Sequence, residues 1–342
     1  MNLGLVMGGG GLVGIAWELG VLAGLQEAAG LDPTSAAVIV GSSAGSVAGA
    51  QAALGRDLVD LVESQLRTAS SASGPTEAAT AASRTAPDGD RAGTAGQARS
   101  VPPEILEAMM SSTGSIEERA AKIGQMALEA HVPMEEDAYV ESFRSFLGTD
   151  GWPGVDLRVT TAEAETGRSV LWSRDDGIGL VRAVASSCAI PCFFPPVSFR
   201  GKHYVDGPRG GYMAGLAGEK ALDGILFVGP NAAMPPQLVR QVELEELADK
   251  GMPVVMVTGG EVVAGIGMDL MNPALRAKAA EAGVADGRQA AGQVKALLRL
   301  RPARIRSREA AQFSSASSSV GDPGGRPERL SAEGPSGQGE VP

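Results

Sequence analysis

The sequence predicts an α/β fold of three layers, α/β/α, in which a mostly parallel sheet is covered by helices on both faces. Two observations predict it. Residues 3–7 and 37–40 are short, continuous apolar runs, which are typical of strands buried on both faces. Each run is followed by a glycine-containing turn and then by apolar residues at helical spacing. In such a sheet, functional groups collect beyond the carboxyl ends of the strands, where both turns lie.

The first unit runs from the strand at 3–7 through four glycines at 8–11 into a helix with Ile15, Leu19 and Leu22 on one face. Asp32 and Pro33 then break the chain before the second strand. The second helix begins after the turn Gly41-Ser42-Ser43-Ala44-Gly45. Later elements are expected as strands at 157–162, 169–172, 225–228 and 254–257, a hairpin at 197–205, and helices at 180–187 and 273–298.

One large domain is expected over residues 1–300. Residues 68–100 contain no Leu, Ile, Val, Met or aromatic residue, so they are predicted to form a flexible insertion. Residues 101–150 are predicted to form a helical cap over the open end of the sheet. Residues 301–342 are rich in Ser, Gly, Pro and charge, which predicts a disordered tail.

Charge and composition exclude several classes of protein. The net charge of −11 argues against a nucleic-acid binder, which needs clustered Lys and Arg, and against electrostatic attachment to an anionic membrane. Two cysteines, Cys188 and Cys192, and two histidines are too few for a disulfide framework or a convincing metal site. We therefore expect packed, free cysteines, no metal and no cofactor.

The N-terminus lacks a basic leader, and the longest apolar runs are expected to fall short of the ~20 residues that a membrane span needs. We expect a cytoplasmic protein. The sequence carries no signal for its oligomeric state.

Gly41-Ser42-Ser43-Ala44-Gly45 fits the pattern Gly-x-Ser-x-Gly between a strand and a helix. In this pattern the serine sits on a sharp, strained turn that exposes its hydroxyl, and glycine is needed on either side because larger residues would collide. The following helix N-terminus favours developing negative charge. Ser43 is therefore a candidate nucleophile, while an ordinary turn of small residues is the alternative.

The glycine run at 8–11 offers consecutive backbone N–H groups at a helix N-terminus, which is an anion site. An acyl-transfer enzyme needs such a site for its oxyanion. A dinucleotide-binding turn is the alternative, since Gly9, Gly11 and Gly14 satisfy Gly-x-Gly-x-x-Gly. The acidic residue expected at the end of the second strand is missing, however, and Gly41 follows there instead.

A serine nucleophile also needs a base. His203 is one candidate, although it lies in a predicted hairpin strand, and His131 is another. The orienting acid of His203 would be one of Asp150, Asp156, Asp175 and Asp176. Without a histidine, a carboxylate must serve directly.

Four motifs in series resemble the patatin-like phospholipases over roughly residues 3–300. They are Gly9-Gly10-Gly11-Leu12-Val13-Gly14, Gly41-Ser42-Ser43-Ala44-Gly45, the stretch from Ser186-Ser187-Cys188-Ala189-Ile190-Pro191 through Phe194-Pro195-Pro196, and Tyr204-Val205-Asp206-Gly207. The resemblance implies a patatin-like fold and acyl hydrolysis of phospholipids or other lipid esters without a metal. It implies Ser43 as nucleophile, Asp206 as its partner in a dyad, and an oxyanion hole made by the amides of Gly9, Gly10 and Gly11, to which we add Ala44.

Phe193, Phe194 and Pro195 are predicted to cover the site and to receive an acyl chain, with simple core packing as the alternative. We expect a lipid or acyl-ester substrate, which would bring the protein into transient contact with a membrane surface. Asp206-Gly207 is followed by Pro208 rather than the family's usual Gly or Ala. This departure keeps open a second function, a lipid-binding protein that has lost turnover. A third is an acyltransferase with the same chemistry, in which an alcohol or thiol acceptor replaces water.

Overall fold

The computed structural model describes residues 1–68, 115–207, 216, 221–233 and 242–300, which belong to one folding unit, Met1–Pro302. Its strands are β1 (Leu3–Met7), β2 (Val38–Ser42), β3 (Leu157–Glu163), β4 (Ser169–Trp172), β5 (Val197–Phe199), β6 (Lys202–Val205), β7 (Gly224–Val228) and β8 (Val254–Val257). Its helices are α1 (Gly11–Ala29), α2 (Ala44–Ala53), α3 (Leu58–Thr68), α6 (Ile116–Glu129), α7 (Glu136–Leu147), α8 (Leu180–Ser187), α10 (Val242–Asp249), α11 (Glu261–Ile266) and α12 (Arg276–Leu298). Short 3-10 turns are η1 (Pro33–Ser35), η2 (Arg174–Asp176), η3 (Asn231–Ala233) and η5 (Pro273–Leu275).

The strands form one sheet in the order β5-β6-β3-β2-β1-β7-β8, and β4 also pairs with β3. β1 pairs in parallel with β2 and β7, β2 with β3, and β7 with β8. β4, β5 and β6 form an antiparallel edge beside β3. Met7 lies opposite Gly41 in the register of β1 and β2, so the glycine-rich turns that follow these two strands lie side by side.

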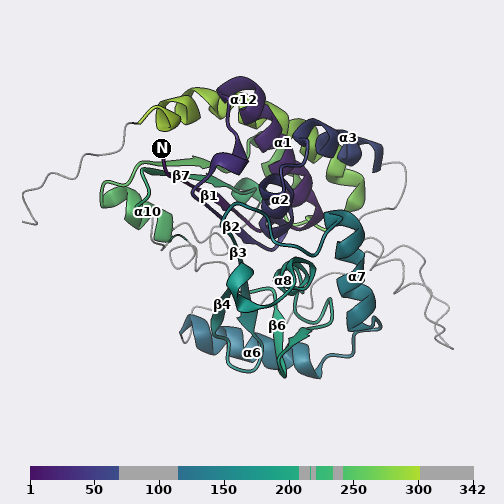
Figure 1. Cartoon of the computed structure of the whole chain (residues 1–342). Helices are drawn as coiled ribbons and strands as arrows, with labels where there is room; N and C mark the ends of the chain where they lie inside the picture. The colour runs from purple at the N-terminus through teal and green to yellow at the C-terminus, as the bar shows by residue number, and fades with distance from the viewer. Residues whose placement is uncertain (69–114, 208–215, 217–220, 234–241, 301–342) are drawn as a thin grey trace, which may run out of the picture. The chain divides into compact units, whose positions relative to one another are not determined.

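The two faces of the sheet are covered by different helices (Figure 1). Leu5 and Ile39 lie in the larger apolar core, which contains residues of α1, α2 and α12. Val40 and Phe227 lie in a smaller core on the opposite face, together with Leu244 of α10. Side chains alternate between the faces along each strand, so one sheet supports both cores. The predicted three-layer arrangement with a mostly parallel sheet is confirmed.

Helix α1 begins at the glycine run and is buried along most of its length between the sheet and α12. The Trp17 indole N–H donates to Asp286 of α12 at 2.8 Å. By length and apolar composition α1 is long enough to cross a membrane, so the expectation that no segment reaches that length was wrong. In the fold this apolar surface is covered by neighbouring elements, as in the core helix of a globular domain.

Helices α6, α7 and α8 are grouped around the end of the sheet that holds β4 and β6 (Figure 1). Helix α6 begins with a capping box: the Glu118 amide donates to the Ser115 hydroxyl at 3.1 Å, and the Ser115 amide donates to the Glu118 carboxylate at 2.7 Å. Helix α8 packs on β3 and β6, and α7 packs on α8. Helix α8 therefore lies between α7 and the strands β3 and β6.

The predicted strands and the helix at 180–187 are confirmed. Helices α3, α10 and α11 were not predicted; α10 and α11 have 8 and 6 residues, too few for a helical period to stand out. Residues 69–100 of the predicted insertion, residues 101–114 of the predicted cap and the tail at 301–342 lie outside the described residues.

Candidate active site

Ser43 occupies the sharp turn between β2 and α2, with φ 52° and ψ −120°. Positive φ is rare for residues with a side chain and strains the backbone. The flanking glycines are required by close approach. A Cβ on Gly41 would lie 2.5 Å from the Gly45 carbonyl oxygen, and a Cβ on Gly45 would lie 2.3 Å from the Met7 carbonyl carbon. The turn therefore forms only where small residues let α2 pass directly over the end of β1.

Asp206 follows β6 directly and meets Ser43 through the register of the sheet. Ser42 pairs with Thr160 on β3, and Ala162 of the same strand pairs with Val205. Asp206 consequently comes opposite the carboxyl end of β2. The Ser43 hydroxyl donates to Asp206 Oδ2 at 2.6 Å, although 163 positions separate the two residues. The structure thus brings together the two residues singled out from the sequence, while their catalytic roles stay predictions.

The end of β6 is held in place by hydrogen bonds on both sides. The Thr161 hydroxyl donates to the Val205 carbonyl at 2.7 Å. The Asp206 amide donates to the Ala189 carbonyl at 2.9 Å. Both contacts are made by the peptide group between Val205 and Asp206, so they fix the backbone directly before Asp206, and the position of its carboxylate does not depend on the Ser43 contact alone.

The strained peptide groups of Ser43 are held by neighbouring side chains. The Ser43 amide donates to the Ser187 hydroxyl at 2.8 Å. The Ser43 carbonyl accepts from the Ser46 hydroxyl at 2.7 Å and from the Cys188 thiol at 3.3 Å. Burial, and then the negative charge of Asp206, raise the pKa of the Cys188 thiol, so it stays protonated and remains a donor. Sequence reasoning expected Cys188 to be a small packed residue and assigned no role to Ser187 or Ser46.

The glycine run lies directly beside this turn. The Gly45 amide donates to the Gly8 carbonyl at 2.8 Å, and the Gly8 amide donates to Val228 of β7 at 2.8 Å. Further along the run, the amides of Gly9, Gly10 and Gly11 have no acceptor within the described part of the chain. The same holds for the Ala44 amide, at the first position of α2. These unengaged donors sit at the N-terminal ends of α1 and α2, where the helix dipoles favour an anion.

Glu18 of α1 is fully buried behind the glycine run, and neither of its carboxyl oxygens has a hydrogen-bond partner among the described residues. Burial raises the pKa of Glu18 well above its usual 4.5, and the nearby Gly8 amide offsets this only in part. The hydrogen bond of that amide goes to Val228 instead. Burial therefore favours the neutral, protonated form of Glu18. Sequence reasoning gave it no role.

The residues predicted to form an acyl pocket, Phe193, Phe194 and Pro195, are all buried. The Phe194 ring stacks on Tyr139 of α7 with centroids 4.9 Å apart and meets the Phe193 ring edge-on at 4.7 Å. The Tyr139 hydroxyl donates to the Ala185 carbonyl of α8 at 3.3 Å. Burial, followed by the nearby Cys188 and Asp206, raises the pKa of Tyr139. These aromatic rings lie next to the candidate site, and their contact with an acyl chain stays a prediction.

The two histidines lie in other surroundings. The His203 ring pairs with Glu165 at 2.7 Å, and His131 is exposed in the loop between α6 and α7. The Ser43 hydroxyl instead donates to Asp206. Across the described part of the chain, no group of three or more His, Cys, Asp or Glu could hold a metal ion.

A polar depression of about 840 Å³ lies near the amino ends of β2 and β3, away from Ser43. Its arginines are already engaged. Arg158 pairs with Asp156 at 2.8 Å, and Arg174 donates to the carbonyls of residues 153–155. This depression contains neither Ser43 nor Asp206.

The family model described as patatin-like phospholipase matches residues 5–208. Among solved structures, VipD from Legionella pneumophila is 14% identical with a TM-score of 0.41, covering 85% of this chain and 67% of VipD. ExoU from Pseudomonas aeruginosa, in complex with SpcU, is 18% identical with a TM-score of 0.34, covering 92% of this chain and 60% of the other. Human GIVD cytosolic phospholipase A2, in complex with methyl gamma-linolenyl fluorophosphonate, is 12% identical with a TM-score of 0.45, covering 87% and 58%.

The chain thus spans from 58% to 67% of the lengths of these three proteins. No curated protein matches it in sequence.

Proposed function

The chain belongs to the patatin-like phospholipase family, and from this premise we propose that it hydrolyses carboxylic esters of lipids with Ser43 as nucleophile and Asp206 as base. The observation that carries the proposal is the 2.6 Å hydrogen bond from the Ser43 hydroxyl to Asp206 Oδ2. A nucleophilic serine needs a base within hydrogen-bond reach, and here that group is a carboxylate.

In the first half of the reaction, the Ser43 oxygen attacks the ester carbonyl while its proton passes to Asp206. The carbonyl oxygen becomes an anion and accepts hydrogen bonds from the amides of Gly9, Gly10, Gly11 and Ala44. Such donors are already in place before the charge develops, and each typically contributes about 3 kcal/mol to the transition state. The alcohol leaves with the proton from Asp206, and the acyl group remains on Ser43.

In the second half, Asp206 accepts a proton from a water molecule as the water oxygen attacks the acyl-Ser43 carbonyl. The same amides hold the second oxyanion. Collapse releases the fatty acid, and the proton on Asp206 returns to the Ser43 oxygen. The chemistry uses groups of this chain and water, without a metal or a cofactor.

Substitution of the dyad tests the proposal. Ser43→Ala and Asp206→Asn should each lower hydrolysis of a short p-nitrophenyl ester by a factor on the order of 10⁴ or more, with folding intact. His203→Ala is the matched control and should retain activity, because its ring pairs with Glu165. Full activity of either dyad variant would overturn the assignment, and a near-complete loss in His203→Ala would favour a triad.

A fluorophosphonate probe distinguishes an enzyme from a lipid-binding protein that has lost turnover. Stoichiometric labelling of Ser43, absent in Ser43→Ala, is expected for an activated nucleophile. An unlabelled, folded protein that still binds a lipid would favour the binding function. Product analysis with and without an alcohol acceptor then separates hydrolysis from acyl transfer.

A further inference from the structure

Helix α8 ends at the nucleophile. Ser187 is its last residue and Cys188 its C-cap, and their side chains hold the amide and the carbonyl of Ser43. Both contacts depend on where α8 lies along its own axis. A shift of about 0.5 Å would stretch the 2.8 Å bond between Ser187 and Ser43 toward the limit of a useful hydrogen bond.

Apolar packing alone does little to set this axial position. Leu180, Val181 and Val184 of α8 are buried in the larger core. Burial of apolar surface is non-directional, so it holds α8 against the sheet but resists sliding and rotation less strongly.

Directional contacts supply the remaining restraint. The Trp172 indole donates to the Ser186 hydroxyl at 3.2 Å, and the Thr161 hydroxyl donates to the Ser186 carbonyl at 3.3 Å. The contacts of the charged side chain Arg182 come from α7 and β5.

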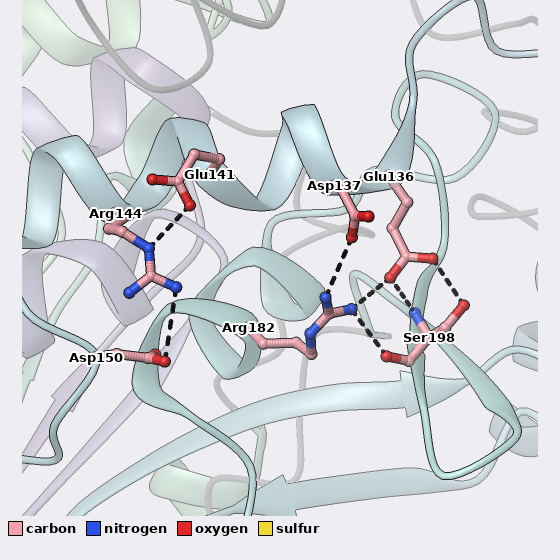
Figure 2. Close-up of polar contacts among 7 residues, drawn as sticks. All are labelled: Glu136, Asp137, Glu141, Arg144, Asp150, Arg182 and Ser198. Atoms are coloured by element: carbon pink, nitrogen blue, oxygen red, sulfur yellow. Dashed lines mark hydrogen bonds and ion pairs between the residues drawn. The ribbon is translucent and has the colours of Figure 1, made fainter.

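Glu136, the first residue of α7, is at the centre of these contacts (Figure 2). Its Oε1 accepts from Arg182 of α8 and from the Ser198 amide of β5 at 2.8 Å. Its Oε2 accepts from the Ser198 hydroxyl at 2.7 Å. Arg182 also donates to the Ser198 carbonyl at 3.0 Å. Three elements are therefore joined by a closed ring of charge-assisted hydrogen bonds, the stronger kind.

This ring is more buried than the charged contact at the other end of α7. The side chains of Arg182 and Glu136 are 31% and 26% exposed, against 45% and 44% for Arg144 and Asp150, whose nearest charged atoms are 3.7 Å apart. Asp150 in turn accepts from the Val181 amide at 2.9 Å, at the start of α8 (Figure 2 shows Arg144 and Asp150). Less exposed charges are screened less by salt, so the Glu136 ring is the stronger restraint.

We propose that Glu136 is a positioning residue for this reaction: by holding Arg182 and Ser198 it sets the axial position of α8 and keeps Ser187 and Cys188 on Ser43. The inference rests on the function proposed above. Glu136 touches neither the substrate nor the reacting atoms, so its effect must travel through α8. It should alter the rate of the chemical step and leave substrate binding unchanged.

Glu136→Gln is the test, because it removes the charge and one acceptor while keeping the shape. We expect kcat to fall by about 5- to 50-fold with KM within about twofold, since small misplacements of reacting groups are costly. The rate of fluorophosphonate labelling of Ser43 should fall by the same factor. Asp137→Asn is the matched control: it loses the same charge on the adjacent residue, but Asp137 is 94% exposed and 3.4 Å from Arg182. Its kcat should stay within about twofold of wild type.

Arg182→Gln and the double variant test whether the effect passes through one contact. The double variant should be no slower than the slower single variant, because each change breaks the same ring. If Glu136→Gln does not fold, Ser198→Ala replaces it, since this change removes a single hydrogen bond; kcat should fall by about two- to fivefold.

Unchanged kcat and labelling in a folded Glu136→Gln variant would overturn the inference, as would a rise in KM without a change in kcat. A wild-type protein that neither labels nor hydrolyses esters would overturn the proposed function itself. An active wild type with an equally active Glu136→Gln variant would overturn this inference alone.

Discussion

Ser43 is held by backbone contacts on one side and by side-chain contacts on the other. On the side of β1 and α1, backbone meets backbone: the Gly45 amide donates to the Gly8 carbonyl at 2.8 Å, and a Cβ on Gly45 would lie 2.3 Å from Met7. On the side of α8 and β6, side chains make the contacts. A hydroxyl and a thiol from α8 and a carboxylate after β6 all reach Ser43.

The difference has a consequence for substitutions. A backbone contact at van der Waals distance leaves no room for a larger residue, so a single added methyl group must displace a strand or a helix. A side-chain contact can be removed without moving the backbone, and its loss costs one hydrogen bond and the order that it supplied. Substitutions on the side of β1 and α1, the backbone-built side, should therefore abolish activity in one step. Substitutions on the side of α8 and β6, the side-chain side, should lower it gradually.

Among substitutions of the residues that surround the dyad, Gly45→Ala should give the largest effect. Its Cβ would meet Met7 and Gly8 backbone atoms at 2.3–2.5 Å, and backbone cannot rotate away. We expect activity below about 1% of wild type and a Tm lower by about 5 °C or more. Gly49→Ala, one turn along α2, is the control, because its Cβ would meet side-chain atoms of Ile39 and Met7 at 3.3–3.4 Å. A Gly45→Ala variant with normal activity would remove the distinction between the two sides.

Ser187→Ala should give the next largest effect, on the side-chain side. It removes the hydroxyl that accepts from the Ser43 amide at 2.8 Å, so the strained backbone of Ser43 loses one of the contacts that hold it. We expect kcat to fall by about 10- to 100-fold with KM little changed. Ser186→Ala is the control: this neighbouring serine is equally buried but bonds to Ala183 and Trp172. Its kcat should stay within about threefold, and equal losses in the two variants would point to a general effect on folding.

The same contrast explains how much the sequence could predict. The backbone-built side can be predicted from residue types, because few patterns other than a sharp strand-to-helix turn place glycines at 41 and 45 around a serine. The side-chain side cannot be predicted in this way. Asp206 came from a family resemblance, since spacing alone left His203 open as a base.

Apart from the pairing of Ser43 with Asp206, the contacts between distant segments at this site were not predicted from the sequence. The Ser187 hydroxyl meets an amide 144 positions away, and nothing local to either residue indicates this. Tyr139 falls within the predicted helical cap at 101–150, but its hydroxyl contact with α8 depends on how α7 packs. Glu18 falls among apolar neighbours in a helix, and its burial follows from the position of α1 between the sheet and α12. Tertiary packing decides all three.

Glu18→Gln should give a smaller effect that depends on pH, because Glu18 lies behind the backbone-built side. The pKa of the folded state lies above 4.5, so from pH 4.5 upward the unfolded chain releases this proton while the folded chain keeps it. Stability is therefore lost as pH rises, at a rate of about 1.4 kcal/mol per pH unit until the folded-state pKa is reached. Gln cannot ionise and escapes this loss.

Urea unfolding of both proteins between pH 4 and pH 8 measures this difference. We expect the free energy of unfolding of Glu18→Gln to gain on wild type as pH rises, and the difference between the two to level off below pH 4.5. A constant difference across the range would mean that Glu18 is ionised in the folded protein. That result would require a hydrogen-bonding partner for the Glu18 carboxylate. The backbone-built side of Ser43 would then depend on a side-chain contact as well.

Cys188→Ala should give the smallest effect, because the Ser43 carbonyl has a second donor. The thiol, which donates at 3.3 Å, is a weak donor, whereas the Ser46 hydroxyl donates to the same oxygen at 2.7 Å. We expect kcat of Cys188→Ala to stay within about threefold of wild type. The double variant with Ser46→Ala leaves that carbonyl without either donor, so its loss should exceed the product of the two single losses. Simple additivity would show that the two donors do not substitute for one another, and the side-chain side would then be as intolerant of change as the backbone side.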